Sequence, residues 1–262
     1  MAVYLNTFIP ICFNGFGSNN ANAHCLPLFI DGSCRREPDF QNPFPAITQL
    51  CRPGKLVPRL SVGDFVIYLT KVGNYRSPPA HWNFIAILEV LNLQLNHISA
   101  ANYYLASNIP ISQNIICNHT APFTLNMTHG LSGFPHGNLN PNRIISIWNN
   151  NYISRANNFP KVAITSVWKD HLHLNNPPQI THQMMMDIFN RIPGTQNPPR
   201  LTGVEWDNFR RIMNVYQPIT ANKRQRSRAP ICIPLAVRLK DNTETETNGI
   251  YKTTFQNKQK TK

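Results

Sequence analysis

The most informative stretch of the sequence is Val62-Gly63-Asp64-Phe65-Val66-Ile67-Tyr68-Leu69. Gly63 can take a positive φ and Asp64 can bond its own backbone, so the pair predicts a turn. The apolar run that follows is rich in β-branched and aromatic residues, and it predicts a strand over Phe65–Leu69. A second run of this kind predicts a strand over Phe84–Val90. The long connection between them, Gly73–Pro79, belongs to the class of surface loops that often carry function.

Working outward, residues 2–13 are apolar and predict the first strand, followed by a flexible Gly- and Asn-rich loop over residues 15–20. Residues 31–60 contain five prolines and predict loops or short strands, because proline disrupts helices. Further strands are expected over Arg143–Trp148 and Val162–Trp168.

Three helices are expected. His97–Ser107 is followed by Pro110, which stops a helix. Thr181 can cap a helix that runs to Ile192. In the third, apolar residues recur at helical spacing and indicate core packing: Trp206, Phe209, Met213 and Tyr216.

A Val-Gly-Asp strand, a variable loop and a hydrophobic strand that ends in Glu89-Val90 together resemble the PUA-like superfamily of nucleic-acid-binding barrels, with its ASCH, EVE and YTH relatives. Cys34-Arg35-Arg36 and Leu50-Cys51-Arg52-Pro53-Gly54 are more similar to one branch, the nucleotide-modification-associated domains. The resemblance covers roughly the first half of the chain, and its motifs are short.

This resemblance implies a small β-barrel with flanking helices and a pocket for a base. It also implies that the end of the first strand lines that pocket, which makes Asn6, Asn14 and the loop Gly15–Ser18 candidate ligands. The alternative for each of these positions is an ordinary exit from a strand into a loop. We therefore expect an α+β fold with a PUA-like barrel core. Residues 1–220 would form this domain with its helical C-terminal part, and residues 221–262 would form a basic, disordered tail.

The charge balance is basic, with 25 Lys and Arg against 12 Asp and Glu. More than half of the excess lies in residues 221–262, which hold 10 basic and 3 acidic side chains. Four of these cations lie in one run and are predicted phosphate contacts: Lys223, Arg224, Arg226 and Arg228. Such a surplus favours polyanions through counterion release but carries no sequence specificity. A solvated tail without a binding role has the same composition.

A second group of charges lies between residues 35 and 59: Arg35, Arg36, Glu37, Arg52, Lys55 and Arg59. Arginine can contact a phosphate or a guanine edge with two parallel hydrogen bonds. Glu37 could accept from an exocyclic amine of a base, or could pair with one of the arginines. The alternative is a solvated basic loop.

Aromatic side chains supply the stacking faces on which bases are held. Tyr75 and Trp82 are predicted to do so because they lie in the loop between two strands. Tyr68 and Trp148 are weaker candidates, since a position within or at the end of a strand favours the core. The site hypothesis is that the Arg35–Glu37 and Arg52 loops face the Tyr75–Trp82 loop across the mouth of the barrel.

No cofactor or metal is expected. The six cysteines include no C-x-x-C pair, and only His171 and His173 are closely spaced histidines, placed on one face of a strand. Cys51 beside Arg52 could act as a nucleophile with a histidine such as His81, although a structural thiol is the commoner role. No P-loop, G-x-S-x-G or dinucleotide-binding motif occurs.

The sequence shows no secretory signal and no apolar run of transmembrane length, so we expect no membrane association, a cytoplasmic location and reduced thiols. The predicted function is binding of a nucleic acid or nucleotide through a pocket for a base, including a modified one. Two alternatives stay open, an enzyme that acts on a nucleobase or nucleotide in DNA modification and a non-catalytic subunit of a nucleic-acid-processing complex.

Overall fold

The computed structural model describes residues 1–33, 36–75, 77–116 and 152–215. Its sheet is organised around β3 (Phe65–Thr70) and β4 (Trp82–Gln94), which confirms both strands expected from the apolar runs. Gly63 has φ +84°. The Asp64 carboxylate accepts from the amides of Ala2 at 2.6 Å and Ser61 at 2.9 Å. The Gly-Asp pair therefore fixes the turn before β3 and fastens the start of the chain to it.

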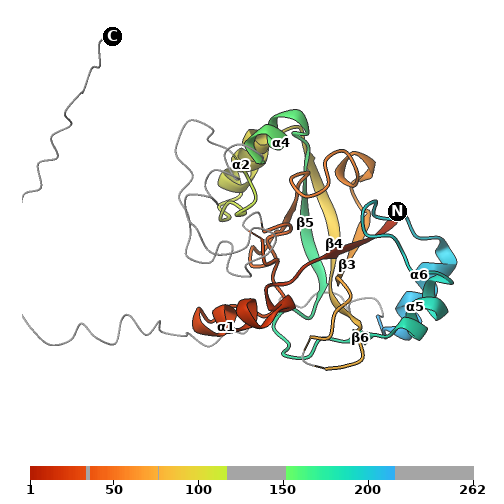
Figure 1. The fold of residues 1–262 in the computed structure, drawn as a ribbon. Helices are drawn as coiled ribbons and strands as arrows, with labels where there is room; N and C mark the ends of the chain where they lie inside the picture. The colour runs from red at the N-terminus through yellow and green to blue at the C-terminus, as the bar shows by residue number, and fades with distance from the viewer. Residues whose placement is uncertain (34–35, 76, 117–151, 216–262) are drawn as a thin grey trace, which may run out of the picture. The chain divides into compact units, whose positions relative to one another are not determined.

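The other strands extend the sheet on both sides (Figure 1). The first strand, β1 (Val3–Phe8), lies parallel to β3, and β5 (Val162–Asp170) lies antiparallel to β4. Two short strands complete the sheet: β2 (Ala46–Ile47) pairs with β5, and β6 (Gln179–Ile180) pairs with β4. The resulting order is β1-β3-β4-β5-β2, with β6 off this path.

The sheet curls into a half-barrel, and the described chain is an α+β fold as expected. The pairing of β4 with β5 shifts register twice, between Ile87 and Leu88 and between Val90 and Asn92. Such irregularities bend a strand and increase its twist, so β4 can bend through its length.

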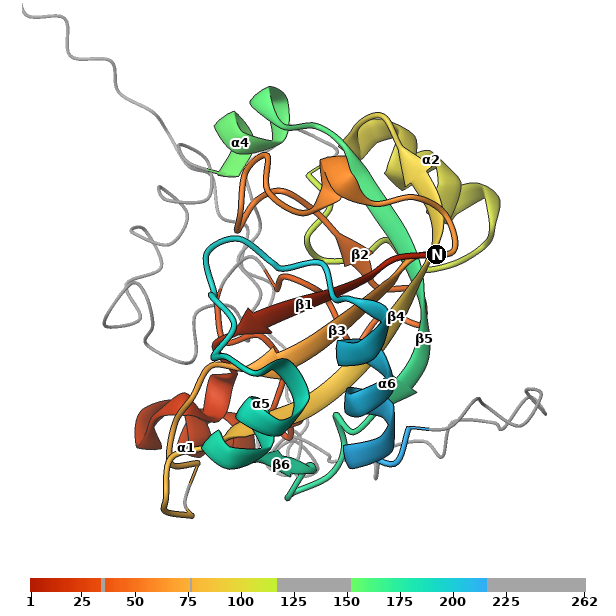
Figure 2. The ribbon, with the colours of Figure 1, turned by 90° about the vertical axis from the view of Figure 1, so that its right-hand side faces the viewer.

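The two faces of the sheet carry separate cores, because successive side chains of a strand point to opposite faces. On β3, Val66 and Tyr68 belong to the core on one face, together with Tyr4 and Phe8 of β1. Ile67 and Leu69 belong to the core on the other face, which α5 (His182–Phe189) and α6 (Gly203–Ile212) cover (Figure 2).

The three predicted helices are present. The first is α2 (His97–Ala106), and the second is α5, capped by Thr181 as expected. Helix α5 ends at Phe189 rather than Ile192 because Asn190 takes a left-handed conformation with φ +53°. The third, α6, begins with a capping box between Thr202 and Glu205. A short helix, α4 (Ile153–Asn158), was not expected.

The prediction of a loop over residues 15–20 is wrong, because α1 (Gly15–Ala23) occupies this segment. The Asn14 side chain caps the helix by accepting from the Gly17 amide at 2.8 Å. Ala21 is fully buried, so packing overrides the weak helix propensity of glycine and asparagine. The predicted strand over residues 2–13 is also too long, since the strand ends at Phe8 and Ile11–Phe13 form a 3-10 helix.

Two expectations about cysteines and histidines need correction. Cys25 is disulfide-bonded, whereas reduced thiols were expected. His171 and His173 lie in a turn after β5 rather than on one strand face. Burial and the neighbouring Lys169 lower the pKa of His171, whose ring packs edge-on against Phe84.

Several predictions fall outside the described residues and stay predictions. They are the strand over Arg143–Trp148, the base-stacking candidate Trp148, the domain boundary at residue 220 and the tail over residues 221–262 with its cations Lys223, Arg224, Arg226 and Arg228. Among the helices that are described, none is long and apolar enough to cross a membrane.

Candidate functional site

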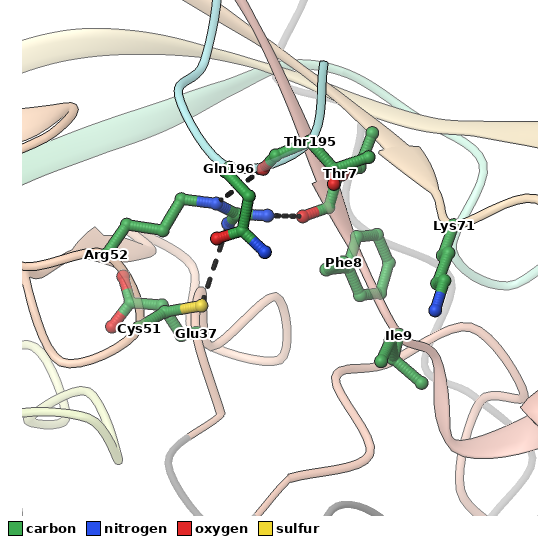
Figure 3. A pocket seen from close by; sticks show the side chains of 9 residues that line it. All are labelled: Thr7, Phe8, Ile9, Glu37, Cys51, Arg52, Lys71, Thr195 and Gln196. Atoms are coloured by element: carbon green, nitrogen blue, oxygen red, sulfur yellow. Dashed lines mark hydrogen bonds between the residues drawn. The ribbon is translucent and has the colours of Figure 1, made fainter.

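A cavity of about 280 Å³ opens where β1 ends (Figure 3). Its walls come from β1 and the residue after it, from the polypeptide that follows β3, and from three loops. The lining residues are Thr7, Phe8, Ile9, Glu37, Cys51, Arg52, Lys71, Thr195 and Gln196. Because β1 and β3 are parallel, their ends meet at one edge of the sheet, and this places Lys71 beside Phe8.

Arg52 joins three segments at this cavity. Its Nε donates to the carbonyl of Thr195 at 2.9 Å and its Nη2 to the carbonyl of Thr7 at 2.7 Å. Its Nη1 lies 3.6 Å from the sulfur of Cys51. The turn that carries Arg52 is closed by Gly54, which has φ +70°. Two of the guanidinium nitrogens thus hold the fold, while the side chain still lines the cavity.

Glu37 brings a buried carboxylate to the same cavity. It is 5% exposed and accepts from the amide of Thr48 at 2.6 Å and from the Thr48 hydroxyl. The side-chain amide of Asn114 donates to it at 3.4 Å. Burying a carboxylate costs free energy unless hydrogen-bond donors compensate it, and these donors do so for Glu37. The carboxylate is thereby held in place as an acceptor for a polar group of a ligand.

Tyr68 lies in β3 next to these residues and is fully buried. Burial, with a smaller contribution from the negative charge of Glu37, raises the pKa of its phenol, while nearby Arg52 lowers it. The phenol therefore stays protonated and is a donor. The Asn6 amide is near enough to lower this pKa, yet the Tyr68 hydroxyl completes no hydrogen bond of good geometry among the described residues.

The other predicted cations have different roles. Arg36 is 1% exposed, and its guanidinium donates to the carbonyls of Asp31 and Ser33, so it organises its own loop. Arg59 lies over the ring of Tyr4 and donates to the Pro198 carbonyl. Lys55 is exposed, and Arg35 lies outside the described residues.

The two asparagines predicted from the resemblance are engaged locally. Asn6 is 5% exposed, and its Oδ1 accepts from the Thr7 amide at 3.0 Å. Asn14 caps α1. Neither lines the cavity at the end of β1, although the Asn6 side chain lies close to the phenol of Tyr68.

The predicted aromatic wall does not form at this cavity. Tyr75 lines a second cavity instead. Trp82 is the first residue of β4, 7% exposed, and packs in the core beneath α5 and α6. The structure therefore brings Glu37 and Arg52 together as predicted but separates them from both loop aromatics.

Sequence reasoning missed Lys71 and the Thr195–Gln196 loop. Lys71 had a usable signal, because it is the first charged residue after a strand that pairs in parallel with β1. Thr195 and Gln196 lie in a segment without a motif, and Arg52 brings this segment to the cavity by a contact across 143 residues.

Neither a metal site nor a thiol–imidazole pair is assembled by the described residues. No three of their His, Cys, Asp or Glu side chains gather as a metal would require. His81 contacts the carbonyl of Pro79 and the ring of Tyr75, while Cys51 contacts Arg52. Comparison with family models, curated proteins and solved structures finds no match to this chain.

Proposed function

We propose that the cavity at the end of β1 binds a nucleotide, either free or within a nucleic acid. The proposal rests on the lining of this cavity, in which two cations lie together with polar side chains that can form hydrogen bonds to the edge of a base. Arg52 and Lys71 line the cavity from opposite sides, and Glu37 and Gln196 lie with them (Figure 3). Cations suit a phosphate, while a carboxylate and an amide suit the edge of a base.

The size of the cavity limits the ligand. About 280 Å³ lies just below the usual range for small-molecule sites, which is about 300–1000 Å³. A single nucleotide unit is in keeping with this volume, whereas a large cofactor is not. The basic surplus of the whole chain favours a polyanionic partner by an independent route.

Lys71 gives the direct test, because it is exposed and makes no hydrogen bond through its ammonium group among the described residues. Lys71→Gln should weaken binding of all oligonucleotide sequences alike, and should reduce the slope of log affinity against log salt by about 1. Fluorescence anisotropy with labelled oligonucleotides across a salt series measures both quantities.

Lys169→Gln is the matched control, since Lys169 is an exposed cation on β5, three strands away from β1. Both variants keep residues 221–262, so any contribution from that segment cancels. Equal slopes for Lys71→Gln and Lys169→Gln would remove this cavity as the nucleotide site.

Tyr68 tests the buried surroundings of Glu37 and Arg52, which line the cavity. Tyr68→Phe deletes a buried hydroxyl that has no partner among the described residues, so the free energy of unfolding should stay constant or rise. Nucleotide affinity should stay within about twofold of the wild type, because Tyr68 is not among the residues that line the cavity. Urea denaturation and calorimetric titration provide the two readouts. A large fall in affinity at unchanged stability would contradict this expectation and show that the hydroxyl takes part in binding.

A further inference from the structure

A second cavity, of about 330 Å³, is lined by Cys12, three residues after Ile9 of the first cavity. Four separate parts of the chain form it, and its wall includes two aromatic rings and three asparagines: Phe29, Tyr75, Asn22, Asn175 and Asn176. None of the lining residues that the structure describes carries a formal charge at neutral pH, and Arg76, between Tyr75 and Ser77, lies outside the described residues. This neutrality distinguishes it from the first cavity, which contains Arg52, Lys71 and Glu37.

Tyr75 is held firmly in this wall. Its ring contacts Phe13, Phe29 and His81, with centroid separations of 6.1, 6.0 and 5.7 Å. Its hydroxyl donates to the carbonyl of Lys71. Its backbone has φ +37°, which is uncommon for a bulky residue and is retained only where the surroundings impose it.

Gly73 makes room for this ring. A Cβ built at Gly73 would lie 3.2 Å from one atom of the Tyr75 ring and 3.2 Å from the ring of Phe13. Glycine at this position therefore lets both rings pack against the backbone. The loop is shaped to present an aromatic side chain at a fixed place, which is the arrangement that base stacking requires.

The asparagines supply polar groups around the rings. The side chains of Asn22, Asn175 and Asn176 make no hydrogen bond among the described residues. Each amide carries both donors and acceptors, and this combination matches the edge of a nucleobase. A planar heterocycle placed between these amides and an aromatic ring would be recognised by its flat shape and by the hydrogen-bonding groups along its edge. Such recognition requires no charged side chain.

We propose that this second cavity binds an uncharged planar heterocycle, with a nucleobase presented as its nucleoside as the ligand class. The choice of a nucleobase among such heterocycles rests on the proposed function. The site itself does not, because it shares no lining residue with the first cavity. Tyr75 provides the stacking face, and Asn176 and its neighbours contact the edge of the base.

Calorimetric titration of the full chain with adenosine, guanosine, cytidine and thymidine tests this proposal. These nucleosides carry no phosphate, so neither the first cavity nor the basic C-terminal residues attract them by charge. At least one nucleoside should bind at millimolar concentration. Tyr75→Leu should weaken this binding by at least about fivefold, the lower end of the range for base–aromatic stacking.

Two further variants distinguish a loss of binding from a loss of folded structure. Tyr75→Phe keeps the ring and loses only the hydrogen bond to Lys71, so it should bind the nucleoside within about twofold of the wild type. Asn176→Ala alters an exposed side chain and should weaken binding about 3- to 10-fold while the melting temperature is unchanged.

Failure of this proposal can be told apart from failure of the first one. If no nucleoside binds, or if folded Tyr75→Leu and Asn176→Ala bind like the wild type, the second cavity is not a heterocycle site. The oligonucleotide assay with Lys71→Gln then still decides the first cavity. If nucleosides bind in a Tyr75-dependent way while Lys71→Gln has no effect, only the first proposal is lost.

Discussion

Replacing Trp82 by alanine should lower the free energy of unfolding by about 3–5 kcal/mol, the usual range for a buried large aromatic residue. The reason is its position in the core rather than any contact with a ligand. Trp82 is 7% exposed, pairs with Ile180 of β6 and packs among residues of β1, β3, α5 and α6. Urea denaturation followed by circular dichroism measures the change.

Phe16→Ala is the control for this prediction. Phe16 lies in α1 with 49% of its surface exposed, so its replacement should change the free energy of unfolding by less than about 0.5 kcal/mol. A Trp82→Ala variant that is as stable as Phe16→Ala but has lost nucleotide affinity would restore Trp82 as a stacking residue. The sequence pattern favours that role for Trp82 because the tryptophan comes before the apolar run, where a loop is expected.

The error at Trp82 has a physical origin. Pro78 and Pro79 end the connection just before it, so the strand can begin as soon as the prolines stop. The strand then starts two residues earlier than the apolar run Phe84–Val90 indicated, and the tryptophan becomes its first core residue. The polar residue Asn83 interrupts the apolar run, so a pattern of continuous hydrophobic residues does not include the first two residues of the strand.

The strands and helices with strong local patterns could be predicted from the sequence. Phe65–Leu69 is a dense apolar run, and Thr181 and Thr202 begin helices whose apolar residues recur at helical spacing. Helix α1 could not be predicted, because glycine and asparagine carry almost no helical signal, and the helix rests on the Asn14 cap and on the burial of residues such as Ala21.

The candidate site was partly predictable. Glu37 and Arg52 are predictable because they belong to a group of charges in one loop region that coincides with the family resemblance. Their neighbours Lys71 and Thr195 reach the cavity through strand pairing and a long-range hydrogen bond, neither of which leaves a local pattern. Likewise, nothing in the sequence indicates that Tyr75 belongs to a different cavity from Arg52.

Arg52→Ala should lower the free energy of unfolding by about 3 kcal/mol and also weaken nucleotide binding. The stability loss follows from two charged hydrogen bonds, to the carbonyls of Thr7 and Thr195, each of which contributes about 1.5–3 kcal/mol. The binding loss follows from removal of a cation from the cavity. Urea denaturation gives the first quantity, and calorimetry on folded protein gives the second.

Two variants separate these effects. Lys55→Ala removes an exposed cation three residues away and should leave the free energy of unfolding within about 0.5 kcal/mol of the wild-type value. Arg52→Lys keeps the charge, but a compact ammonium lacks the planar fork that donates to two carbonyls at once. It should therefore recover part of the affinity and little of the stability. If Arg52→Lys is instead as stable as the wild type, a positive charge alone is enough to hold the Thr195 loop. The forked geometry of the guanidinium is then not required to maintain this cavity.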